Sequence, residues 1–474
     1  MGCKGRTINE TEMKKCLIIF LSVGLIVGNI GCKKFLEQQP YNRLAVDDIF
    51  KDFDGARTTL VGLYDNLKST SYYLKDFYIY PELTGGNIKY SRPANLTLQQ
   101  SYNFQNDPLN NDMEGFYKNA YSTIYGCNNV LNYIGDVSDA STAQKNRMLA
   151  DALTIRALAH FDLMRVFSMP YNFTPGATHP GIALKTFNAP TTNPVSDVAS
   201  AKAVYDQIVS DLDSAINLYN RSVPIYVGGN DKTWLSADAA KAILSRVSLY
   251  KEDWAKTIAL TTQLITSNAY TLTSNFQYVE SWSKKNISSE SIFELAYGTR
   301  TGGSLGDYFN PLNAMNAQLA ATNDLLNLYS PGDVRGQSSL FVNRTINGTT
   351  FYYTRKYQGM NDSANNIKVI RLSEIYLNRA EAYAETNNLT DALADLNTIR
   401  ARANPSAPNF TSTDKQAIIN EILVERRREL AFEGHAFFDL ARKKKSITRS
   451  DCTGLNCTLT YPDPRFAVPI PLPQ

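Results

Sequence analysis

The sequence predicts a mainly α-helical protein in which paired helices stack into a superhelix and two insertions form a loop-rich, partly β subdomain. Three observations lead to this fold class. Apolar residues recur three and four positions apart over several long runs, which is the spacing of one helix face. These runs come in pairs, so each pair has an apolar face to bury. Two segments between the pairs, 69–112 and 268–367, lack this spacing and carry many aromatic and β-branched residues.

The clearest helix pair spans residues 369–402 and divides at the polar turn 386–388. Aromatic and small residues within it fall at the spacing of a tetratricopeptide repeat, in which two helices interlock. These residues are Tyr376, Ala380, Tyr383, Ala392 and Leu396. Because one pair cannot bury its own apolar face, the repeat predicts neighbours elsewhere in the chain.

Further helix pairs are expected near 54–135, 143–219 and 237–266, which gives about four pairs with 369–402. Repeat stacking needs about three, so we expect residues 51–474 to form a single body. The second insertion should contain strands at Ser291–Tyr297 and Thr349–Tyr357.

A charged helix is expected from Asp414 to Phe438. Its three consecutive arginines, Arg426 to Arg428, alternate with glutamates at positions 425, 429 and 433. This pattern favours an internal ion-pair network over a phosphate site.

Composition excludes several function classes. The formal net charge is only +3, with basic and acidic residues interleaved, so nothing favours nucleic acid as a partner. The chain has 28 Tyr but three His, which favours amphipathic contact surfaces over histidine-based metal or acid–base chemistry. The sequence contains no G-x-S-x-G, H-E-x-x-H or phosphate-loop motif, and no motif marks a pair of glycosidase carboxylates. We therefore expect no enzymatic activity, no metal and no cofactor.

Residues 1–31 are expected to be a leader, with the true start at Met13. A short basic region precedes an apolar run, Cys16 to Ile30, that is too short to span a membrane comfortably. The following Gly31-Cys32 resembles a bacterial lipoprotein cleavage site, so Cys32 is expected to be lipidated and 32–50 to be a tether. An ordinary secretory signal is the alternative. In an exported protein Cys452 and Cys457 can form a disulfide or stay reduced.

The ligand site is expected on the two insertions. Sugar rings offer C–H faces that stack on aromatic planes and hydroxyls that bind amide, carboxylate or guanidinium groups. Packing inside the fold is the alternative role for each candidate. The candidate ligand-binding residues are Tyr72, Tyr78, Asn87, Tyr90 and Arg92 in the first insertion, and Tyr278, Trp282, Asp307, Tyr308 and Asn310 in the second.

The chain resembles the SusD/RagB family of outer-membrane nutrient-binding lipoproteins. The resemblance is carried by RLSEIYLNRAEAYAE from Arg371, LADLNTIRARA from Leu393 and EILVERRRELAFEGHAFFDLAR from Glu421. It runs over essentially the whole chain after Cys32. One departure is Ala436, where the family usually has Arg.

This resemblance implies a SusD-like tetratricopeptide superhelix and a non-catalytic lipoprotein on the outer membrane, facing the cell exterior. It implies capture of oligosaccharides and their transfer to a SusC-like TonB-dependent barrel. Peptide binding of the RagB type is one alternative, and a tetratricopeptide protein-interaction scaffold is another. The sequence leaves open which glycan is bound and which leaflet the anchor occupies, since Lys33 and Lys34 follow Cys32 without an adjacent acidic residue.

Overall fold

A computed structural model describes most of the chain after residue 45. The described residues are 9, 46–92, 96–188, 198–226, 231–283, 288–296, 305–311, 318–357, 365–452 and 454–472. Cys32 and Tyr297 lie outside them. The chain divides into two compact units, residues 1–49 and 50–474. In the first unit Val46–Ile49 form helix α3, and all further elements belong to the second.

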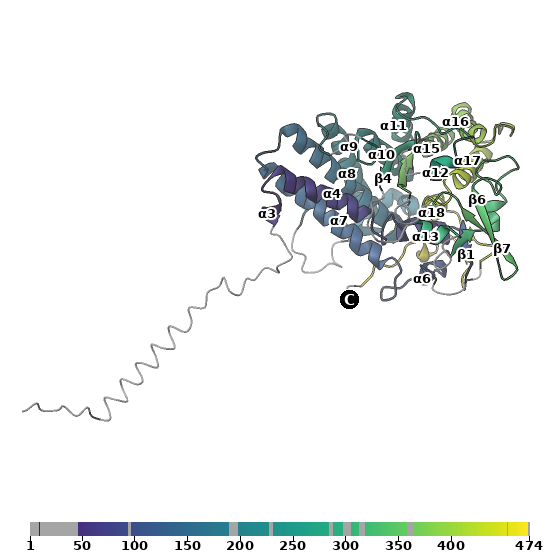
Figure 1. The fold of residues 1–474 in the computed structure, drawn as a ribbon, viewed down its shortest axis with the longest axis horizontal. Helices are drawn as coiled ribbons and strands as arrows, with labels where there is room; N and C mark the ends of the chain where they lie inside the picture. The colour runs from purple at the N-terminus through teal and green to yellow at the C-terminus, as the bar shows by residue number, and fades with distance from the viewer. Residues whose placement is uncertain are drawn as a thin grey trace, which may run out of the picture. The chain divides into compact units, whose positions relative to one another are not determined.

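A series of helices packs in chain order through the second unit (Figure 1). Each helix contacts the next one, and α11 packs directly on α15 although the whole second insertion separates them in sequence. The helices are α4 (Phe53–Leu67), α7 (Glu114–Tyr133), α8 (Thr142–Phe167), α9 (Ala201–Tyr219), α10 (Ala237–Tyr250), α11 (Trp254–Thr266), α15 (Leu372–Glu385) and α16 (Leu389–Ala403). This arrangement confirms the predicted mainly α fold of paired, stacked helices.

Local sequence explains where these helices begin. Ser141 precedes α8, and its hydroxyl accepts a hydrogen bond from the Gln144 backbone while the Gln144 side chain accepts one from the Ser141 backbone. This reciprocal capping box satisfies two amides that the helix leaves open. At the turn between α15 and α16, Asn387 takes a φ of 63°, a left-handed conformation that Asn tolerates well.

Small residues let α15 and α16 approach closely, as the repeat spacing predicts. Ala380, Ala384, Ala392 and Leu396 are fully buried in one apolar cluster. The cluster is completed by isoleucines 418, 419 and 422 from α17 (Lys415–Glu429). The third helix therefore covers the face that one repeat cannot bury alone.

The prediction that the repeat is helical from Val369 is wrong. Ile367–Arg371 form strand β8, which pairs antiparallel with β4 (Ser291–Leu295), and α15 starts only at Leu372. All five residues of β8 are buried. A strand buried on both faces gives a continuous apolar run that spacing alone cannot distinguish from a buried helix.

The prediction of a single helix from Asp414 to Phe438 is also wrong. The chain forms α17, turns, and continues as α18 (Ala436–Arg442). In the turn Phe432 and Gly434 take φ angles of 68° and 83°. The carboxylate of Glu82 stabilises this turn by accepting backbone hydrogen bonds from Phe432 at 2.9 Å, Gly434 at 3.0 Å and His435 at 2.9 Å. Because Glu82 comes from the distant first insertion, local spacing gave no sign of the break.

The first insertion is a packed part of the body. It contains α5 (Asp76–Thr84), whose nine residues are all buried, followed by β1 (Ile88–Tyr90) and α6 (Gln99–Tyr102). Strand β1 pairs antiparallel with β5 (Leu319–Ala321), so the two insertions share a small sheet. Figure 1 shows β1 beside the β6–β7 hairpin.

The remaining elements are short. They are α12 (Glu280–Ser283), α13 (Leu305–Phe309), α14 (Asn323–Leu326), β2 (Pro180–Ala183), β3 (Val198–Ser200), β6 (Phe341–Ile346), β7 (Thr349–Thr354), β9 (Ile447–Thr448) and β10 (Thr458–Leu459). Cys452 and Cys457 form a disulfide, one of the two states the sequence allowed. Within the described residues, no helix combines the length and apolar character needed to cross a membrane.

Candidate functional site

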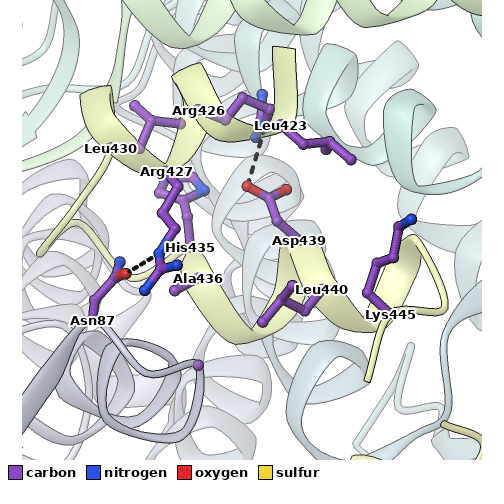
Figure 2. Close-up of a pocket in the computed structure, with 11 residues that line it drawn as sticks. Asn87, Leu423, Arg426, Arg427, Leu430, His435, Ala436, Asp439, Leu440 and Lys445 are labelled. Carbon is purple, nitrogen blue, oxygen red and sulfur yellow. Dashed lines mark hydrogen bonds and ion pairs between the residues drawn. The ribbon is translucent and has the colours of Figure 1, made fainter. Parts of the chain in front are cut away.

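A pocket between α17 and α18 contains one predicted ligand residue, Asn87 (Figure 2). Its volume is about 80 Å³, whereas ligand pockets usually measure roughly 300–1,000 Å³. Asn87 Oδ1 accepts a hydrogen bond of 2.7 Å from Arg427 Nε, and Asn87 Nδ2 donates one of 2.7 Å to Glu82. Both the oxygen and the nitrogen of the Asn87 side-chain amide therefore already form hydrogen bonds within the protein. The pocket has room for a few water molecules but not for a sugar ring.

Four predicted aromatic platforms are buried, and their hydroxyls and rings contact the interior. Tyr72 donates a 2.7 Å hydrogen bond to Asp162, and the Tyr78 hydroxyl donates to the Lys368 carbonyl. Arg402 lies 4.6 Å from the ring centre of Tyr278. These contacts hold the rings in the core, so they offer no exposed face for a sugar.

Trp282 is the most informative of the four, because the sequence left it equally open to packing or stacking. Its side chain is only 2% exposed. Lys356 and Lys368 lie 4.6 and 4.5 Å from the ring centre, and Arg371 lies 5.5 Å away. Cations near an indole face are attracted by its π-electrons. Trp282 therefore packs against buried charges in this structure.

Two further candidates are also buried. The Tyr90 hydroxyl donates a 2.6 Å hydrogen bond to the Thr97 carbonyl, and its ring meets the edge of Tyr102 at 4.7 Å. Asn310 is 5% exposed at the end of α13. Seven of the ten candidates are therefore buried, which favours the packing role given as the alternative for each: Tyr72, Tyr78, Asn87, Tyr90, Tyr278, Trp282 and Asn310.

The other three candidates, Arg92, Asp307 and Tyr308, are partly accessible and come from both insertions. Backbone hydrogen bonds around Gln318 hold their segments together. The Gln318 carbonyl accepts from Ser91 at 2.7 Å, and the Gln318 amide donates to the Tyr308 carbonyl at 3.2 Å. The β1–β5 pairing therefore brings residues that are more than two hundred positions apart to one place.

Two residues that the sequence analysis missed, Lys75 and Asp76, lie beside Tyr308. Lys75 Nζ is 3.0 Å from Asp76 Oδ1 and 5.9 Å from the centre of the Tyr308 ring. No motif marks these two residues, because the distant β1–β5 pairing determines what lies next to them. We call Lys75, Asp76, Arg92, Asp307 and Tyr308 the insertion junction.

Burial shapes the electrostatics of the insertion junction. It raises the pKa of Asp76 to about 6, with Lys75 opposing the shift and Asp112 adding to it. Burial also raises the pKa of Tyr308, so its hydroxyl stays protonated. The junction thus combines an aromatic ring, an ammonium group, a guanidinium group and carboxylates. This set can stack a sugar ring and bind its hydroxyls.

Among the described residues, no group of three His, Cys, Asp or Glu side chains is placed to hold a metal ion.

Two family models match the chain in succession. The model described as "Starch-binding associating with outer membrane" matches residues 34–249, and the SusD family model matches 271–456. The chain belongs to the SusD family. The SusD assignment agrees with the helical array and with the motifs around α15, α16 and α17.

Individual SusD relatives match over nearly their full length. SusD-like protein P38 of Formosa agariphila is 24% identical, over 91% of each chain. A SusD superfamily crystal structure from Bacteroides vulgatus is 27% identical with a TM-score of 0.78, covering 89% of this chain and 96% of that one. Surface glycan-binding protein A from Bacteroides thetaiotaomicron shares the fold at 18% identity, with a TM-score of 0.72 and the same coverage.

Proposed function

We propose that this protein binds oligosaccharides at the outer membrane and passes them, without catalysis, to a SusC-like TonB-dependent transporter. The observation that carries the proposal is the insertion junction, where the partly accessible side chains of Tyr308 and Lys75 lie beside the buried carboxylate of Asp76. The starch-binding description of the matched family model supports the same class of ligand. Arg92 and Asp307 supply further hydrogen-bonding groups.

The expected affinity is low. One aromatic platform contributes about 1–3 kcal/mol, by analogy with bases that stack on aromatic side chains. With a few hydrogen bonds this gives dissociation constants of roughly millimolar to micromolar. Weak binding suits a protein that must release its cargo to a transporter.

Affinity electrophoresis of the mature chain in gels that contain starch or other polysaccharides tests the proposal. Tyr308→Ala should abolish most of the retardation that the wild-type protein shows. Phe276→Ala is a matched control, because Phe276 is another aromatic of the second insertion and is 92% exposed. Equal retardation of wild type and Tyr308→Ala would place the site elsewhere. Binding of peptides without glycans would favour the RagB-type alternative, and release of shortened sugars would overturn the non-catalytic role.

The membrane part of the proposal rests on Cys32, which lies outside the described residues. Lipidation at Cys32 would hold the protein at the outer membrane, facing the exterior. Cys32→Ser should move the protein from the membrane fraction to the soluble periplasmic fraction, detected by fractionation and immunoblotting. Unchanged membrane association would contradict a lipid anchor.

A further inference from the structure

A second hollow lies among the stacked helices and contains none of the insertion-junction residues. It is bounded by the start of α8, the segment before α10 and strand β4, and it measures about 350 Å³. This volume falls within the range of roughly 300–1,000 Å³ that is usual for small-molecule sites. Its wall contains Trp234 and Tyr270 together with Asp231, Lys232 and Asp238.

Trp234 is held rigidly at the edge of this hollow. The Tyr226 ring stacks on it with a centre distance of 3.8 Å and an angle of 9°, and the Tyr64 ring meets it edge-on at 5.0 Å. The next residue, Leu235, donates its backbone hydrogen bond to the Tyr64 hydroxyl at 3.0 Å. Trp234 is itself only partly buried. A rigid, partly open indole is a pre-organised stacking surface, since binding to it costs little conformational entropy.

Polar groups of both kinds surround the indole. Lys232 Nζ donates to the Ser288 carbonyl at 3.1 Å and lies 5.0 Å from the Tyr270 ring centre. The Tyr270 hydroxyl donates to Asp238 at 3.3 Å. Asp231 accepts a 2.8 Å hydrogen bond from the Thr233 backbone. The lining therefore offers carboxylate acceptors, an ammonium donor and a phenol around one aromatic plane.

The charges of the lining balance, which argues against an ionic ligand. Arg147 is paired with Asp151 at 3.0 Å, and Asp238 lies 3.3 Å from Lys241. Of the other two charged residues in the lining, Lys232 is positive and Asp231 is negative, so their charges cancel. A site with no net excess of charge favours a neutral ligand that presents one apolar face and several hydroxyls. Sugars are neutral molecules of this kind.

We propose that this hollow is a second carbohydrate site, which takes one neutral monosaccharide unit with its C–H face on Trp234 and its hydroxyls on Asp231, Lys232 and Asp238. The choice of ligand class rests on the proposed glycan function. The site is separate from the insertion junction and does not require Tyr308.

Labelling the full mature protein with 5-fluorotryptophan gives a direct test by fluorine NMR. The chain has only three tryptophans, and Trp234→Phe identifies the signal of position 234. Glucose, galactose, mannose and xylose are titrated separately to roughly 50 mM, well above a millimolar dissociation constant. At least one sugar should shift the Trp234 signal saturably while the Trp254 signal stays in place.

Two variants and two controls connect this shift to the site. Tyr270→Ala and Asp238→Asn should each weaken the apparent affinity at least about fivefold, as expected for loss of one stacking or charged contact. Tyr125→Ala removes a tyrosine elsewhere that is 55% exposed and should have no effect. Tyr308→Ala should also leave the shift intact even where it abolishes polysaccharide binding, which separates the two proposals. Thermal unfolding verifies that each variant is folded.

The second site would be overturned by the absence of a saturable Trp234 shift with any of the four sugars, or by a shift that both Tyr270→Ala and Asp238→Asn leave unchanged. Loss of the shift in Tyr308→Ala would also overturn it, because the signal would then report the insertion junction.

Discussion

Arg371 and Glu429 are joined by a 2.7 Å hydrogen bond between Arg371 Nη1 and Glu429 Oε1, and both side chains are fully buried. The bond connects the end of β8 to the end of α17. Glu429 also accepts from Arg335 at 2.9 Å and from Arg402. Burial alone would raise the pKa of Glu429, but Arg402, Arg371 and Arg335 outweigh it and hold the pKa well below its usual value.

Glu429→Gln should therefore destabilise the protein strongly. Removing one partner of a buried ion pair costs about 3–5 kcal/mol, because the remaining charges stay desolvated without compensation. Urea unfolding measures the loss. Asp206→Asn is the control, since Asp206 pairs with Lys202 on the surface and such pairs contribute only about 0–1 kcal/mol. Equal losses in the two variants would contradict a special role for the buried network.

The buried carboxylates also predict how stability depends on pH. Burial would raise the pKa of Glu374 and Glu381, but Arg246 and Arg442 respectively outweigh it and lower both values to about 2. A carboxyl group with a lowered folded-state pKa stabilises the fold above its unfolded pKa, and this contribution disappears as pH falls through the folded value. The urea midpoint should therefore hold from pH 7 to about 5 and fall steadily between about 4.5 and 2. A midpoint that stays constant down to pH 2 would contradict these lowered values.

The sequence predicted the ion-pair network around α17 but not all of its partners. The run Arg426–Arg428 was expected to pair with the glutamates that alternate with it. Arg428 does contact Glu425, at 2.9 Å. Arg426, however, pairs with Asp439 at 3.1 Å, and Arg427 binds Asn87. Helical spacing predicts partners one turn away. Asp439 instead lies beyond the break between α17 and α18, and Asn87 comes from the first insertion.

The burial of the aromatic candidates could not be predicted for the same reason. The helix positions could be predicted from apolar residues three and four positions apart, because this spacing is a local property of each segment. Burial of Tyr72 or Trp282 depends on segments far along the chain, such as Asp162 or Lys368. An aromatic-rich insertion has the same composition whether it forms a core or a binding surface. The sequence therefore predicted the array of helices better than the site.

Trp282→Ala tests the packing role of this side chain. Loss of a buried Trp should cost about 3–5 kcal/mol, because it leaves a cavity and removes the ring that Lys356 and Lys368 face. Circular dichroism during urea unfolding measures this. Phe276→Ala, at a 92% exposed position, should change the free energy of unfolding by no more than about 0.5 kcal/mol. Loss of sugar binding with unchanged stability would instead return Trp282 to the ligand site.

The insertion junction predicts a pH dependence of glycan binding. Asp76 has a pKa raised to about 6 by burial, with Lys75 opposing and Asp112 adding to the shift. Above pH 6 its carboxylate is ionised, so it holds Lys75 in place beside the Tyr308 ring. Below pH 6 it is protonated, and Lys75 loses its 3.0 Å partner. Affinity for a bound polysaccharide should therefore rise a few-fold between pH 5 and 7, about the size of one charged contact.

Isothermal titration calorimetry at several pH values measures this dependence, and two variants assign it. Asp76→Asn should bind weakly at every pH and lose the midpoint near 6, because the amide cannot ionise. Asp206→Asn should keep the wild-type profile, since Asp206 lies on the surface of α9 and its pKa is lowered rather than raised. A wild-type midpoint that survives in Asp76→Asn would show that another group titrates. Such a result would separate the pH dependence from the junction, because Asp76 is the junction group whose folded-state pKa lies near 6.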